Sequence, residues 1–224
     1  MKLLVLIAVC MTGLAAAAND FITDDPDSEF LMIANPFYRI TMFPGHLFPV
    51  FWKNGCGQAF PDIAFCDCLI DVQTKNKYFL RLDRFAQRRI IRNAPGMITV
   101  EMTGSFCRSY EETDPDKVTA KYCWTFSRNS PAIKVDIQLE RPAAKIGYEL
   151  HLLEITWKDS DFKSIGPSSK IIGRPPFGFT LSGSGKNIIR TAAGNHMTSV
   201  RLEEKCLWRN NVYQCSAVLT IWGN

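Results

Sequence analysis

The stretch Lys121–Arg141, KYCWTFSRNSPAIKVDIQLER, alternates apolar and polar side chains and predicts a β-hairpin. Its middle, Ser127–Pro131, contains the Ser, Asn and Pro residues that are typical of a turn. Since a period of two places all apolar side chains on one face, the hairpin must pack against a second layer. The apolar positions are Tyr122, Trp124 and Phe126 before the turn and Ile133, Val135, Ile137 and Leu139 after it.

The rest of the chain carries the same strand signals from residue 37 to residue 222. Clusters of Gly, Pro, Asn and Asp separate the strand-like segments, and the only helical feature that we expect is a turn within Leu80–Ile91. A phase slip at Leu152–Leu153 predicts a β-bulge. The sequence therefore predicts an all-β fold, a large antiparallel β-sandwich that forms a single domain over residues 19–224.

The first eighteen residues have the pattern of a secretory signal peptide. Lys2 is followed by a short apolar stretch, and Ala15–Ala18 supplies small residues for cleavage. We therefore expect a secreted, extracellular protein, with residues 19–34 as a loose N-terminal arm. The charge of +4, which falls to +3 without Lys2, is too mild for a nucleic-acid-binding protein. No later apolar stretch is long enough to predict a membrane span.

The cysteines predict disulfide bonds, because an exported chain meets an oxidising environment. Of eight cysteines, Cys10 lies in the predicted signal peptide, which leaves seven. In CLWRNNVYQC a two-residue turn at Asn210–Asn211 places Cys206 opposite Cys215 and Trp208 opposite Tyr213. Cys107 and Cys123 bracket a polar loop and form the second predicted bridge. Cys56 is expected to pair with either Cys66 or Cys68, and the sequence leaves the choice open.

An arginine-rich segment, RLDRFAQRRIIR at Arg81–Arg92, is the first candidate binding site. Arginine presents a planar fork that matches a carboxylate or a sulfate, so Arg84, Arg88 and Arg89 are candidate ligand-binding residues for an acidic glycan. The alternative is a solvated strand face whose charges are balanced by nearby acids. Trp52, just before a Gly-rich turn, is the candidate stacking platform for a sugar ring.

The histidines are the candidate catalytic residues. His151, on a predicted strand, and His196, in a predicted loop, could each act as a general base, with an ordinary exposed or hydrogen-bonded histidine as the alternative. No two histidines have metal-ligand spacing, and no Cys-His pattern indicates zinc. The acidic segment Glu111–Asp116 is more typical of a solvated turn than of a calcium loop. The sequence therefore predicts no metal site and no cofactor.

Two further segments carry a family resemblance. NPFYRITMFPG at Asn35–Gly45 resembles the opening strand of the β-supersandwich domains of secreted polysaccharide lyases and galactose-mutarotase-like proteins. RRIIRNAPGMITVEMTGSF at Arg88–Phe106, followed by the hairpin, is similar to their order of strand, turn, long strand and hairpin. The resemblance covers Asn35–Arg141 and includes no active-site motif.

The resemblance implies a carbohydrate-related function. We expect a secreted carbohydrate-recognition protein with acidic glycans as its ligands, and polysaccharide processing stays open. If the protein is an enzyme, the expected class is a polysaccharide lyase, in which a histidine acts as base and an arginine neutralises the substrate carboxylate. The alternative is a secreted protein-binding effector or an extracellular interaction module without glycan activity.

Overall fold

The computed structural model describes residues 21–25, 30–43, 48–54, 64–83, 86–109, 118–141, 147–158, 162–165, 170–173, 178–183, 186–192 and 197–222. Within these ranges the chain forms 17 strands and one short 3₁₀ turn, η1 (Leu80–Leu82), in the segment where the sequence predicted a turn. The strands form three antiparallel sheets, which confirms the all-β prediction. No helix in the described ranges has the length and hydropathy of a membrane span.

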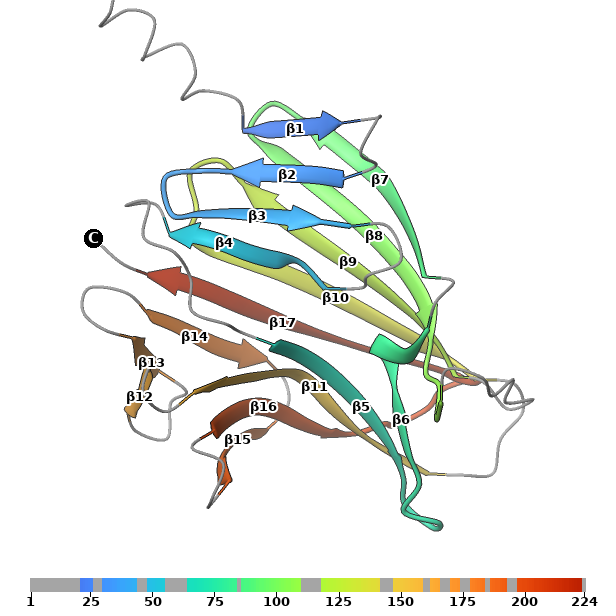
Figure 1. Cartoon of the computed structure of the whole chain (residues 1–224). Coiled ribbons are helices and arrows are strands. Elements are labelled where there is room, and N and C mark those ends of the chain that lie inside the picture. Colours follow the sequence, from blue (N-terminus) through green and yellow to red (C-terminus); the bar gives the residue numbers. More distant parts are fainter. Residues whose placement is uncertain are drawn as a thin grey trace, which may run out of the picture.

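The largest sheet has eight strands in the order β12-β13-β14-β17-β10-β9-β8-β7 (Figure 1). The predicted hairpin forms its centre, with β9 and β10 paired from Thr119↔Glu140 to Thr125↔Lys134. The strands are β7 (Gln87–Ala94), β8 (Met97–Ser105), β9 (Thr119–Ser127), β10 (Ala132–Glu140), β12 (Phe162–Ile165), β13 (Lys170–Gly173), β14 (Gly178–Gly183) and β17 (Val212–Trp222).

The two smaller sheets have the orders β1-β2-β3-β4 and β15-β16-β11-β5-β6. The first contains β1 (Ile22–Asp25), β2 (Phe30–Ala34), β3 (Tyr38–Met42) and β4 (Val50–Asn54). The second contains β5 (Ala64–Asp71), β6 (Lys77–Phe79), β11 (Tyr148–Lys158), β15 (Lys186–Ala192) and β16 (Met197–Lys205).

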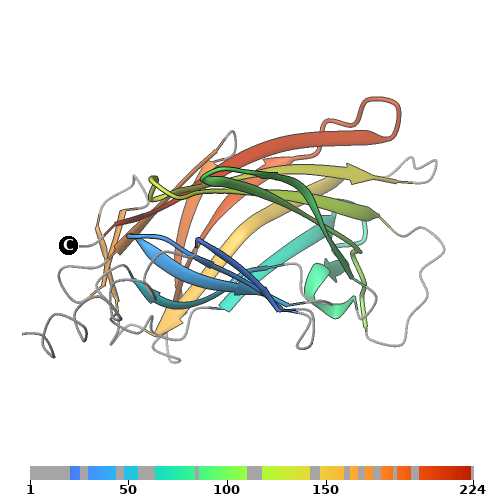
Figure 2. The ribbon, with the colours of Figure 1, turned by 90° about the horizontal axis from the view of Figure 1, so that it is seen from above.

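Both smaller sheets cover the same face of the eight-stranded sheet, as the two views show (Figures 1 and 2). Tyr122 and Phe126 project from one face of β9 because they lie four residues apart on the strand. Phe126 contacts Tyr38 of β3, with ring centroids 6.4 Å apart, and the Tyr122 hydroxyl bonds to Asp67 of β5. One layer of buried side chains therefore packs against both smaller sheets, in the manner of a sandwich.

The side chain of Asn35 joins the four-stranded sheet to the central hairpin. Its oxygen accepts the backbone N–H groups of Phe37 and Tyr38, at 2.9 Å each, and so fixes the β2–β3 turn. Its nitrogen donates to the backbone oxygens of Ser127, at 2.9 Å, and Ser130, at 3.2 Å, in the β9–β10 turn. Asn35 therefore holds the β2–β3 turn against the β9–β10 turn.

The predicted bulge in β11 is confirmed, and it lies over a buried carboxyl group. Leu153 has a φ of 49°, and the register of β11 shifts there against both β5 and β16. The freed N–H of Leu153 donates to Asp67 at 2.7 Å, and Tyr122 bonds to the other oxygen of the same carboxyl group. Burial raises the pKa of Asp67 to about 7, because the core disfavours its charged form.

The predicted Cys107–Cys123 disulfide does not form. No disulfide joins the described cysteines. Cys123 lies opposite Glu101 of β8 in the β8–β9 ladder. Cys107 comes six residues after Glu101 along the chain and pairs with Phe79 instead. Six residues of extended strand span about 20 Å, far beyond disulfide reach.

The predicted Cys206–Cys215 disulfide is also not formed, although its turn is correct. Asn210 and Asn211 both have positive φ, and Arg209 pairs with Val212 across them. The chain then divides between two sheets, because the N–H of Cys206 bonds to the oxygen of Tyr148 in β11 while Cys215 pairs with Ile137 in β10. Trp208 does contact Tyr213 as predicted, with ring centroids 6.1 Å apart.

The remaining predictions about cysteines and termini have mixed outcomes. Cys56 and the side chain of Cys66 lie outside the described residues, so their bridge stays a prediction, and Cys68 is buried. Part of the expected loose arm, residues 19–34, instead forms β1 and β2, where Leu31 and Ile33 are fully buried. The predicted signal peptide lies outside the described residues.

Candidate functional site

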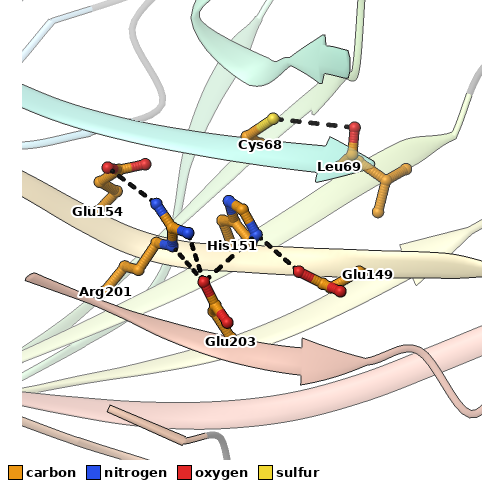
Figure 3. Close-up of polar contacts among 7 residues, drawn as sticks. All are labelled: Cys68, Leu69, Glu149, His151, Glu154, Arg201 and Glu203. Atoms are coloured by element: carbon orange, nitrogen blue, oxygen red, sulfur yellow. Dashed lines mark hydrogen bonds and ion pairs between the residues drawn. The ribbon is translucent and has the colours of Figure 1, made fainter. Parts of the chain in front are cut away.

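A cluster of charged side chains lies on the outer face of the five-stranded sheet (Figure 3). We call it the His151 cluster, and its members are Glu149, His151 and Glu154 of β11 and Arg201 and Glu203 of β16. His151 lies directly opposite Glu203 in the β11–β16 ladder. The neighbouring Leu150, Leu152 and Leu202 point to the opposite face and are fully buried in the core.

The bulge at Leu153 decides which acids join this cluster. Glu149 and His151 share a face because they are two residues apart on a strand. By the same alternation Glu154 would face the core, but the extra residue at Leu153 returns it to the side of His151. The local irregularity therefore brings a third carboxylate to the cluster (Figure 3).

The contacts within the cluster centre on Glu203 Oε1, which both His151 and Arg201 approach. His151 Nε2 lies 2.8 Å from Glu149 Oε1 and 3.7 Å from Glu203 Oε1. Arg201 donates from Nε to Glu203 Oε1 at 2.9 Å, with a second bond from Nη2 to the same oxygen, and from Nη1 to Glu154 at 3.3 Å. His151 and Arg201 are only 8% and 6% exposed. Three carboxylates against one guanidinium give these five residues a net charge of −2 when His151 is neutral.

Sequence reasoning selected only His151 from this cluster. Arg201 and Glu203 lie on a strand about 50 residues further along the chain, and no motif joins them to His151. The local signals are alternation alone, which puts Glu149 on one face with His151, and Arg201 on one face with Glu203 in SVRLEEK, Ser199–Lys205. The pairing of that face with β11 follows from tertiary structure alone.

The predicted arginine site is divided between two faces of β7. Arg88 points inward and donates from Nη1 to the backbone oxygen of Met42, at 2.8 Å, which links β7 to the four-stranded sheet. Arg89 points outward and pairs with Glu101 at 2.7 Å, and Lys121 Nζ lies 3.9 Å from the same carboxylate. We call Arg89, Glu101 and Lys121 the Arg89 surface. Arg88 is therefore a structural contact and does not line a common surface with Arg89.

Three other predicted site residues cannot be placed in a site. Arg84 and His196 lie outside the described residues, and Trp52 lies in β4 but its side chain is not among those described. Their roles stay predictions. Among the described residues, His151 and the arginines 88 and 89 lie on different sheets, so the structure does not bring the predicted base and these predicted carboxylate-binding arginines together.

The comparisons with known proteins give only a fold-level resemblance. No family model matches the sequence, and no curated protein matches it. Among solved structures, the crystal structure of heparan sulfate lyase HepC from Pedobacter heparinus matches with a TM-score of 0.44 and 7% sequence identity. The match covers 87% of this chain and 33% of that chain, so this chain spans about a third of that lyase. No part of the site is inferred from this similarity.

Proposed function

We propose that this protein is a secreted carbohydrate-recognition protein that binds acidic glycans through the Arg89 surface. The observation that supports the proposal is that two exposed cations share one buried carboxylate. The side chains of Arg89 and Lys121 are 70% and 42% exposed, whereas that of Glu101 is 11% exposed. The surface therefore has a net positive charge, and its cationic groups remain open to solvent.

The surroundings of the Arg89 surface suit an extended ligand with many hydroxyl groups. Gln138 and Gln214 follow Lys121 across the sheet in register, and the Gln214 amide donates to Gln138 at 2.9 Å. Nearby, the hydroxyl groups of Thr99 and Thr125 are 3.1 Å apart. Amide and hydroxyl groups both donate and accept hydrogen bonds, so this face offers partners for sugar hydroxyl groups between its charged points.

The expected affinity is modest and depends on salt. Arginine binds sulfate or carboxylate through two parallel hydrogen bonds, which gives geometric selectivity. Exposed ion pairs are worth about 0.2–1 kcal/mol each and are screened by salt. A polymer with repeated acidic groups gains by engaging several such points at once. We therefore expect a polymer to be retained better than its short fragments.

The test measures retention of the mature chain on an immobilised sulfated polysaccharide, a polyuronide and a neutral polysaccharide. We expect retention on the two acidic polymers that falls as salt rises, and loss of it in the Arg89→Ala/Lys121→Ala double variant. Lys77→Ala is the matched control, because Lys77 is an exposed lysine on β6 in the other sheet. Equal retention of the double variant and the wild type would refute the proposal.

Processing of the glycan is not part of the proposal, because His151 and the Arg89 surface lie on different sheets. The second candidate function is binding of an extracellular protein. It is favoured by Leu207, which is 78% exposed between β16 and β17. A single exposed leucine is smaller than the apolar patches that mark protein interfaces, so this candidate ranks second.

A further inference from the structure

We propose that Glu149, His151 and Glu203 bind a divalent metal ion on the outer face of the five-stranded sheet. Each of the three residues offers one ligand atom, and these atoms all lie within 4.8 Å of one another. They come from two adjacent strands, with His151 and Glu203 directly paired in register. This inference is independent of glycan binding, which involves the other sheet.

The distances are close to those of a metal-bound set. An imidazole nitrogen and carboxylate oxygens bind zinc at about 2.0–2.2 Å, and tetrahedral ligands then lie about 3.4 Å apart. The distance from His151 Nε2 to Glu203 Oε1 is 3.7 Å, and the distance to Glu149 Oε1 is 2.8 Å. An ion between them requires mainly an outward shift of Glu149, whose side chain is 39% exposed and can rotate.

Charge and burial favour a cation at this point. The five residues of the His151 cluster carry a net charge of −2, and a divalent ion would neutralise it. His151 and Arg201 are nearly buried, so water screens the negative charge less than at an open surface. Lys205 is exposed and lies opposite Glu149 in the β11–β16 ladder, which places a compensating positive charge at the rim of the cluster.

Arg201 has a positioning role in this site. Its two bonds to Glu203 hold that carboxylate in place, and its bond to Glu154 fixes the guanidinium from the other side. Groups that orient the metal ligands in this way contribute to affinity without touching the ion. Three protein ligands leave one position for water.

The experiment is a titration of the full mature chain with Zn²⁺ and Co²⁺. We expect one ion per chain and at least about 10-fold weaker binding in Glu149→Gln and in His151→Gln. Glu154→Gln is the matched control, because it removes a carboxylate that contacts only Arg201 within the cluster. Bound Co²⁺ should lack a sulfur-to-metal charge-transfer band, which distinguishes this site from binding by cysteine.

The outcomes decide the proposal even if one variant does not fold. The imidazole of His151 is buried, so His151→Gln is checked by circular dichroism first, and Glu149→Gln at the more exposed position gives the deciding comparison. Unchanged affinity in Glu149→Gln, a sulfur-to-cobalt band, or no binding at submillimolar Zn²⁺ would each overturn the proposal.

Discussion

The Arg89 surface and the His151 cluster are built by the same sequence pattern and have opposite properties. Each lies on the outer face of a sheet whose other face packs in the core. Arg89 pairs with one carboxylate and stays mostly exposed, whereas Arg201 is held between two carboxylates and is nearly buried. Alternation in the sequence thus predicts that a residue faces outward, but the register with neighbouring strands decides its partners and its charge environment.

The largest expected effect concerns the core beneath the His151 cluster. Asp67 is fully buried and its pKa is raised from 3.8 to about 7, so folding favours the protonated form. Its contribution is fully present below about pH 4 and is lost as pH rises through about 7, at a cost on the order of 4 kcal/mol. Urea denaturation from pH 4 to 8 measures it.

Asp67→Asn is the control for this pH dependence, since an amide of the same shape does not titrate. The variant should lose the part of the decline between pH 4 and 8 that the wild type shows. Parallel pH curves for the two proteins would contradict the role assigned to Asp67.

A matched pair of arginine substitutions tests the comparison directly. Arg201→Ala leaves Glu154 and Glu203 without their buried partner and should cost about 3 kcal/mol of unfolding free energy. Arg89→Ala removes a mostly exposed side chain and should change stability by less than about 0.5 kcal/mol. Chemical denaturation at pH 7 measures both losses of unfolding free energy. Equal losses would show that burial does not make Arg201 more important for stability than Arg89.

The smallest expected effect sharpens the account of the Arg89 surface. Glu101→Gln removes the carboxylate shared by Arg89 and Lys121, so the local positive charge rises by one. Retention on a sulfated polysaccharide should then increase about twofold at low salt and converge with the wild type at high salt. Weaker retention would mean that Glu101 is needed to position the arginine.

Local patterns predicted the elements of this fold well. The hairpin β9–β10, the bulge at Leu153 and the turn at Asn210–Asn211 each depend on a short stretch of chain, and all three are confirmed. Period-two alternation and the tolerance of asparagine for positive φ are properties of neighbouring residues, so the sequence contains enough information for them.

Long-range pairings could not be predicted in the same way. Cys123 pairs in register with Glu101, and Cys107 lies beyond the end of that ladder, which no local signal indicates. Likewise, the chain passes from the five-stranded sheet at Cys206 to the eight-stranded sheet in β17. The hairpin around Asn210–Asn211 therefore contains only the pair Arg209↔Val212. Arg201 and Glu203 come from a separate strand, and Glu154 joins the cluster only through the bulge, which is why only the histidine was a candidate.

The single additional residue at Leu153 supplies a backbone donor and does not set the inside and outside positions of β11. Leu152 and Leu153 together lie opposite Asp67 of β5, so removal of Leu153 would leave a regular ladder in which Glu154 still faces outward and Ile155 still faces inward. Such a one-codon deletion would instead remove the N–H group that donates to Asp67, together with a fully buried leucine side chain. A related chain could therefore lose the irregularity and keep the pattern of the strand, provided that its core no longer contains a carboxyl group in need of that donor.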